Sequence, residues 1–336
     1  MIKPPRLRIG DTIGVVSPSW GGGAAFPHRV ERGAHQLESL GFRITYGRHA
    51  FNSSGHVSDT PENRVDDIHA MFDDPMVKAI ISTIGGDHSC HLLPLLDFDL
   101  IRSKPKVFMG FSDMTVLNVA IHVKTGLVTF NGSHVMTDFA EYPAMPAFSE
   151  GSFMKTVTDP SPIGALDQST WWTDEILDWE SKQDLTRPRE QHVSEGWTWL
   201  KPGQGTGALI GGCLESLQHL RGTPFWPRWH KTILFLETSE EKPPPETVDG
   251  ILQDYENMGV FDEINGLLFG RPMLYSAEER QQLRDVILKR THRFPFPVVT
   301  DMDYGHTTPT LTLPLGCRAL IDSDRKLVEI IEGAVG

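Results

Sequence analysis

Apolar residues follow two alternating patterns along the first half of the chain. Short apolar runs predict buried strands at residues 12–17, 42–46, 78–84 and 107–111. Apolar residues that recur at helical spacing predict helices at residues 30–40, 61–72 and 113–123. Strands that alternate with helices indicate βαβ units, so we predict an α/β fold with a mostly parallel sheet.

The pattern breaks after residue 164 and resumes near residue 205. Five of the chain's eight tryptophans lie in this segment, namely Trp171, Trp172, Trp179, Trp197 and Trp199. Beyond it we predict a helix at 246–255 and strands at 208–210, 232–237, 266–269, 297–300, 318–322 and 327–332. We therefore expect an N-terminal domain (residues 1–163), a Trp-rich linker and substrate loop (residues 164–205) and a C-terminal domain (residues 206–336).

Composition narrows the class of protein. A chain of 336 residues fits two domains, and a net charge of −13 argues against a nucleic-acid partner. No apolar run is long enough to cross a bilayer. The three cysteines, Cys90, Cys213 and Cys317, are too far apart for a disulfide framework or a zinc ribbon. We expect a cytoplasmic protein that does not associate with membranes.

A serine lies at the junction of a predicted strand and a predicted helix, in Gly110-Phe111-Ser112-Asp113. A strand-to-helix turn exposes the serine hydroxyl and directs the following N–H, that of Asp113, toward a bound carbonyl. A helix N-cap is the alternative interpretation. Gly85-Gly86 ends the preceding strand and could supply a second oxyanion donor. The alternatives are that these glycines form an ordinary tight turn or a phosphate-binding loop. The last lacks its usual Gly-x-Gly-x-x-Gly context.

A serine nucleophile needs a base and an acid that orients the base. His306 lies in a turn-rich loop directly after a predicted strand, and Glu237 ends an apolar strand, where a charge needs a partner. The alternatives are a turn histidine and a solvated carboxylate. Asp301, Asp303 and His306 could in principle share a metal, but no metal-binding motif surrounds them, and we expect no metal and no cofactor.

The motifs taken together resemble the LD-carboxypeptidase family of serine peptidases, and more closely its microcin C immunity branch. In order, they are Arg8-Ile9-Gly10-Asp11, Ile84-Gly85-Gly86, Gly110-Phe111-Ser112-Asp113, Gly211-Gly212, Phe235-Leu236-Glu237 and Gly305-His306. The resemblance implies that Ser112 is the nucleophile, Glu237 the acid and His306 the base, with oxyanion donors at Gly86 and Asp113. It further implies a flavodoxin-like N-terminal domain, akin to class I glutamine amidotransferases, a smaller C-terminal domain and a homodimer.

Two departures from the family pattern concern substrate recognition. Cys213 stands where many members have asparagine, and Glu240-Glu241-Lys242 follows the acid where some immunity-type members have a basic residue.

The family hydrolyses amides of small molecules, either an aminoacyl adenylate analogue or, alternatively, a murein tetrapeptide. An indole can stack on a nucleobase, so the tryptophan-rich segment favours the nucleotide substrate. We predict that Gly85, Trp172 and Trp179 bind it. The alternatives are that these tryptophans pack an interface, and that the chain is a non-catalytic small-molecule binder.

Overall fold

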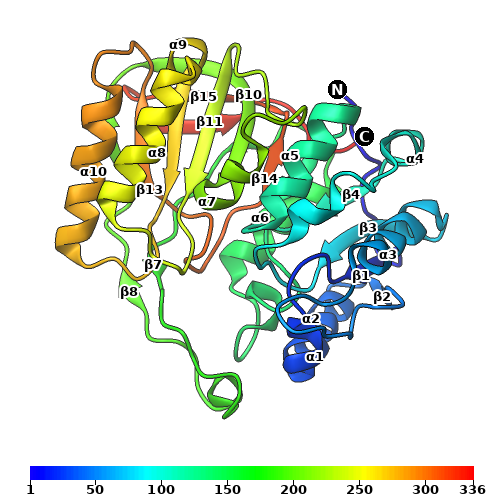
Figure 1. Cartoon of the computed structure of the whole chain (residues 1–336). Helices are drawn as coiled ribbons and strands as arrows, with labels where there is room; N and C mark the ends of the chain where they lie inside the picture. Colours follow the sequence, from blue (N-terminus) through cyan, green and yellow to red (C-terminus); the bar gives the residue numbers. More distant parts are fainter.

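The computed structural model describes all 336 residues and shows two α/β units in contact (Figure 1). One contains a six-stranded sheet and the other an eight-stranded sheet. The predicted α/β class with mostly parallel pairing is confirmed. Most predicted strands are present within a few residues of their predicted bounds, and 232–237 and 318–322 match to the residue.

The first sheet has the strand order β14-β5-β4-β3-β1-β2. Its strands are β1 (Thr12–Val16), β2 (Arg43–Tyr46), β3 (Val77–Ser82), β4 (Val107–Met109), β5 (Thr129–Asn131) and β14 (Leu313–Leu315). All pair in parallel except β14, which is antiparallel to β5. The helices of this unit are α1 (Gly22–Ala25), α2 (Pro27–Ser39), α3 (Pro61–Asp73), α4 (Phe98–Ser103), α5 (Met114–Thr125) and α6 (Ala147–Thr158).

The second sheet has the strand order β6-β16-β15-β10-β11-β12-β13-β9. Its strands are β6 (Gly164–Ala165), β9 (Thr198–Lys201), β10 (Gln204–Cys213), β11 (Thr232–Glu237), β12 (Gly266–Gly270), β13 (Val298–Met302), β15 (Arg318–Asp322) and β16 (Leu327–Ile330). Strands β10 to β13 are parallel and the outer ones antiparallel. The helices are α7 (Leu214–Leu217), α8 (Pro245–Asn257), α9 (Val260–Glu263) and α10 (Ala277–Thr291).

The sheets are not built from consecutive chain segments. Strands β6 and β9 fall inside the segment expected to be a linker, yet both join the second sheet, whereas β14 leaves the C-terminal half to join the first. Between β6 and β9, β7 (Trp171–Trp172) pairs with β8 (His192–Val193) at the base of a long arm that runs to the bottom of Figure 1. We call residues 171–193 the arm.

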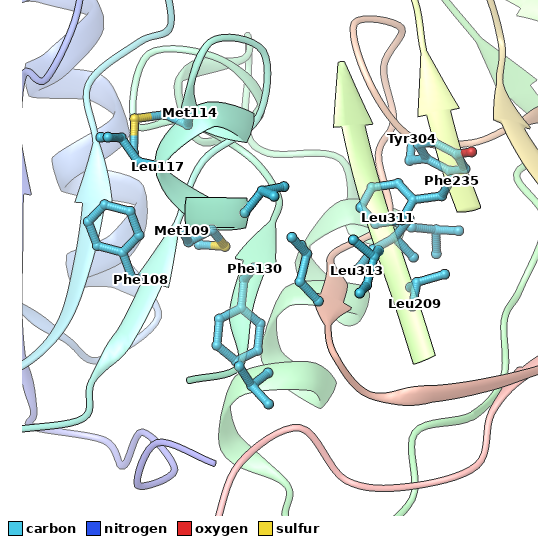
Figure 2. Packing of buried hydrophobic residues seen from close by; sticks show 14 of the residues in the cluster. Phe108, Met109, Met114, Leu117, Phe130, Leu209, Phe235, Tyr304, Leu311 and Leu313 are labelled. Carbon is cyan, nitrogen blue, oxygen red and sulfur yellow. The ribbon is translucent and has the colours of Figure 1, made fainter. Parts of the chain in front are cut away.

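One continuous apolar core joins the two units. Helix α5 is buried on almost every side because it packs against β5 of the first sheet and against α7 and β10 of the second. Figure 2 shows the packing running from Phe108 and Phe130 in the first unit to Leu209 and Phe235 in the second. The shared core sets the position of one unit relative to the other, and with it the geometry of any site between them.

Candidate active site

Ser112 occupies a strained turn between β4 and α5. Its φ is +56°, a left-handed conformation that is unfavourable for a residue with a side chain. Gly85 lies against it: a Cβ at Gly85 would be 2.8 Å from the Cβ of Ser112 and 2.9 Å from its Oγ. Only glycine therefore allows the loop after β3 to approach the serine this closely.

Two backbone N–H groups beside Ser112 are free. Neither Gly86 nor Asp113 donates its N–H to another protein atom, which suits them to an oxyanion. Both are held in place from behind. Ser19 donates its hydroxyl to the carboxylate of Asp113 at 2.5 Å, and the Trp20 N–H donates to the Gly85 carbonyl at 3.0 Å.

The predicted acid and base form a buried pair. The Nδ1 of His306 lies 2.6 Å from the Oε2 of Glu237, and their side chains are 7% and 0% exposed. Gly305 makes this approach possible, because a Cβ there would lie 2.6 Å from the same oxygen. Phe111 packs edge-on against the imidazole at 4.9 Å between ring centroids. This is the relation in which a carboxylate orients a catalytic histidine and leaves Nε2 for the substrate side.

The Nε2 of His306 has a neighbour that the sequence did not reveal. The Oε2 of Glu240 lies 3.0 Å from it, and no hydrogen bond joins His306 to Ser112. Burial acts to lower the pKa of His306, but the charges of Glu237 and Glu240 and the hydrogen bond to Glu237 outweigh it and raise this pKa to about 10. His306 is therefore protonated at neutral pH in this arrangement.

A cavity of about 660 Å³ connects these groups to the arm. Ser112, Gly85, Gly86 and His306 line it together with residues 175–179 of the arm. Its volume is in the range of small-molecule sites. A second cavity of about 110 Å³ is also lined by Ser112, Gly86 and Glu240.

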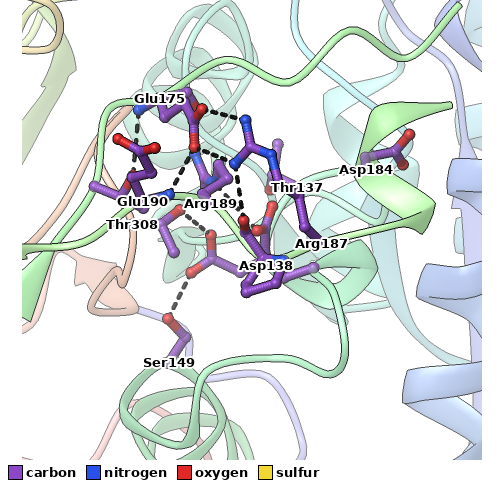
Figure 3. Close-up of polar contacts among 12 residues, drawn as sticks. Thr137, Asp138, Ser149, Glu175, Asp184, Arg187, Arg189, Glu190 and Thr308 are labelled. Atoms are coloured by element: carbon purple, nitrogen blue, oxygen red, sulfur yellow. Dashed lines mark hydrogen bonds and ion pairs between the residues drawn. The ribbon is translucent and has the colours of Figure 1, made fainter. Parts of the chain in front are cut away.

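Trp179 lies in the wall of the large cavity. It packs edge-on against Phe26 at 5.5 Å between ring centroids, and the guanidinium of Arg29 lies 4.7 Å from its ring centroid. Arg29 also pairs with Asp184 of the arm at 3.0 Å, with both side chains buried. Figure 3 shows further arm contacts, including the bidentate ion pair of Arg187 with Glu175, whose two N···O distances are 2.6 and 2.9 Å.

Trp172 lies elsewhere. It lines neither cavity and is 8% exposed. The guanidinium groups of Arg271 and Arg280 lie 5.2 and 5.3 Å from its ring centroid. The structure thus brings Ser112, Glu237, His306 and Trp179 to one site and leaves Trp172 out of it, so the position of Trp172 does not support the substrate contact that we predicted.

The carboxylates that could have joined His306 at a metal are occupied by arginines. Asp303 pairs with Arg271 at 2.8 Å and Asp301 with Arg284 at 3.3 Å. No group of three or more His, Cys, Asp or Glu side chains is arranged to hold a metal ion. The structure also has no helix of the length and apolar character that crossing a bilayer requires.

The resemblance noted in the sequence is confirmed by comparison with known proteins. The model of the LD-carboxypeptidase N-terminal domain matches residues 13–132, and that of the C-terminal domain matches residues 206–321. The chain belongs to the LD-carboxypeptidase family, and is thus a hydrolase of the serine peptidase class.

Individual relatives come from both branches considered above. The microcin C7 self-immunity protein MccF of Escherichia coli is 32% identical over 97% of this chain and 94% of its own length. A probable murein peptide carboxypeptidase of Bacillus subtilis is 30% identical over 98% and 95%. The structure of MccF in complex with aspartyl sulfamoyl adenosine has a TM-score of 0.92, 31% identity and full coverage of both chains.

Proposed function

We propose that this protein is a serine amidase that hydrolyses the amide between an aminoacyl group and a nucleotide-like leaving group. One observation carries the proposal: the strained Ser112, the His306 imidazole and the Trp179 ring line one cavity, and the buried Glu237 pairs with His306 behind that wall. Hydrolysis needs the first two, and recognition of a flat base uses the third.

Each of these groups has a defined role in the proposed reaction. The Oγ of Ser112 attacks the amide carbonyl carbon while the Nε2 of His306, in its neutral form, takes the hydroxyl proton. The N–H groups of Gly86 and Asp113 stabilise the oxyanion, and His306 passes its proton to the leaving nitrogen as the C–N bond breaks. A water molecule then gives a proton to His306 and attacks the acyl-enzyme carbonyl. The ester bond to Ser112 breaks, His306 returns the proton to the Ser112 oxygen, and the free carboxylate leaves. Glu237 keeps the imidazole oriented throughout.

Trp179 supports the choice of a nucleotide substrate, together with the relative that binds aspartyl sulfamoyl adenosine. Murein tetrapeptide hydrolysis is the second candidate, favoured by the carboxypeptidase relative. We also propose that the N-terminal unit is flavodoxin-like, because its strand order β2-β1-β3-β4-β5 is that of flavodoxin-like sheets. The family resemblance implies a homodimer, and the three widely spaced cysteines favour a cytoplasmic location.

The test compares two substrates on one enzyme. We expect the wild-type protein to release aspartate from aspartyl sulfamoyl adenosine faster than D-alanine from a murein tetrapeptide, and Ser112→Ala to release neither. Faster cleavage of the tetrapeptide would favour the second candidate. Tight binding of the nucleotide without any product would instead point to a non-catalytic binder.

A further inference from the structure

Glu240 lies where the catalytic mechanism has no use for a carboxylate. The Nε2 of His306 must face the Oγ of Ser112, yet it lies 3.0 Å from Glu240. Glu240 follows β11 by three residues, in the connection to α8, and its side chain is 51% exposed. It lines both cavities beside Ser112. A half-exposed loop carboxylate is thus poised between the base and the space for substrate.

The titratable groups around His306 come from three parts of the fold. Glu237 ends β11, Glu240 follows it, and His134 lies after β5 on the other side of Phe111. Burial, reinforced by the charge of His306, lowers the pKa of His134 to about 3, so His134 is neutral. Two carboxylates therefore face one imidazole and favour its protonated form, which cannot accept a proton. With Glu240 neutralised or drawn away, an ordinary histidine–glutamate pair would be left.

Neither cavity wall offers Glu240 an unpaired lysine or arginine. The smaller cavity has no lysine or arginine in its wall, whereas Asp87, Glu215 and Glu241 line it together with Glu240.

The three arginines of the large cavity already pair with other carboxylates. These pairs are Arg29 with Asp184, Arg187 with Glu175, and Arg189 with Glu141. A bound molecule can therefore supply the positive charge that pairs with Glu240.

We propose that Glu240 determines specificity by binding a cationic group of the substrate, an ammonium close to the scissile amide, and thereby frees Nε2 of His306 to take the proton of Ser112. The inference rests on the proposed amidase function and names its substrate class: aminoacyl amides with a free amine. Binding of the ammonium releases a proton from His306 to solvent, so the site becomes competent when the correct charge arrives.

The test uses one pair of ligands, aspartyl sulfamoyl adenosine and its N-acetyl derivative, which differ in the charge of the α-nitrogen. We expect the wild-type enzyme to prefer the free amine, and Glu240→Gln to reduce the ratio of kcat/KM for the two by about 10- to 100-fold. Glu246→Gln is the matched control, because it removes a nearby exposed carboxylate that lines neither cavity. It should leave the ratio unchanged.

The pH profile gives a readout that a structural role would not affect. Activity requires neutral His306 and so rises as pH passes its pKa. Removing one of the two carboxylates that raise this pKa should shift the acid limb of kcat/KM for the N-acetyl substrate to lower pH. An unmoved limb, or a ratio equal to that of Glu246→Gln, would overturn the inference.

Binding separates this inference from the proposed function. Calorimetry on Ser112→Ala with both ligands needs no turnover. We expect the free amine to bind more tightly, and the preference to disappear in Ser112→Ala/Glu240→Gln. If the preference persists in the double variant, Glu240 is not the determinant, even where wild-type hydrolysis has established the amidase function.

Discussion

The two sides of the large cavity are built in different ways. On one side, Ser112, Glu237 and His306 lie at or just after the carboxyl ends of strands β4, β11 and β13, and the Glu237 side chain is fully buried. On the other side, the arm contributes Trp179 from a segment with little regular structure, held to the first unit by ion pairs and aromatic contacts. Neither sheet continues into the tip of the arm.

The difference separates chemistry from recognition. The strand-end groups are fixed by backbone geometry and by a core common to both units, so small changes there alter the reacting atoms directly. The arm is positioned by side-chain pairs at its tip, so changes there alter which substrate stays bound. Variants on the two sides should therefore separate into losses in kcat and losses in affinity.

The largest effect is expected from the nucleophile and base. Ser112→Ala and His306→Ala should each reduce kcat by about 10⁶-fold, and the double variant should be no worse, because the two act as one unit. Steady-state kinetics on aspartyl sulfamoyl adenosine measures this. Residual turnover above about one per cent in either single variant would contradict the assignment.

Glu237→Gln should come next. An amide in place of the carboxylate keeps the shape but loses the charge that orients and stabilises the protonated histidine, at a cost of about 10⁴-fold in kcat. Glu240→Gln, which also removes a carboxylate beside the same ring, is the natural comparison. If both variants lose kcat equally on the N-acetyl substrate, Glu237 has no special role as the acid.

This strand-end side is also where the sequence was most informative. An apolar run that ends in Glu237, and a serine between a strand and a helix, are local patterns, and local patterns can be recognised without knowledge of the fold. The contact of Glu240 with His306 was missed because it depends on how the loop after β11 folds back. The signal present was a second acidic residue three positions beyond the first.

The pairing of strands that are far apart in the chain could not be predicted from the sequence either. Nothing in Leu313–Leu315 indicates that it will cross to the first sheet, since strand partners are set by tertiary packing. Helix α10 was missed for a different reason: it has only three buried residues, so its apolar period is weak. Its start was still marked in the sequence by the capping box of Ser276 and Glu279.

A smaller effect is expected from the glycine behind the serine. Gly85→Ala would place a methyl group within 2.9 Å of the Oγ of Ser112, so the serine would have to move. A misplacement of a reacting group by about 1 Å costs about 10²-fold in kcat. Gly151→Ala in α6 is the control, because a Cβ there meets nothing within 4 Å. It should leave kcat unchanged. Equal activity of the two variants would show that the close approach is not needed.

The smallest effect, and the sharpest comparison, concerns the two tryptophans. Trp179 lines the large cavity, so Trp179→Ala should remove about 1–3 kcal/mol of stacking on the base, or about 5- to 150-fold in kcat/KM for nucleotide substrates. A small aspartyl amide without a base should be cleaved as before. Trp172 is buried against Arg271 and Arg280 outside the cavity, so Trp172→Ala should lower Tm and affect all substrates alike. Kinetics on both substrates and a melting curve for each variant distinguish the two roles. If Trp179→Ala loses activity uniformly as Tm falls, the arm tryptophan is a packing residue and the murein substrate becomes the better candidate.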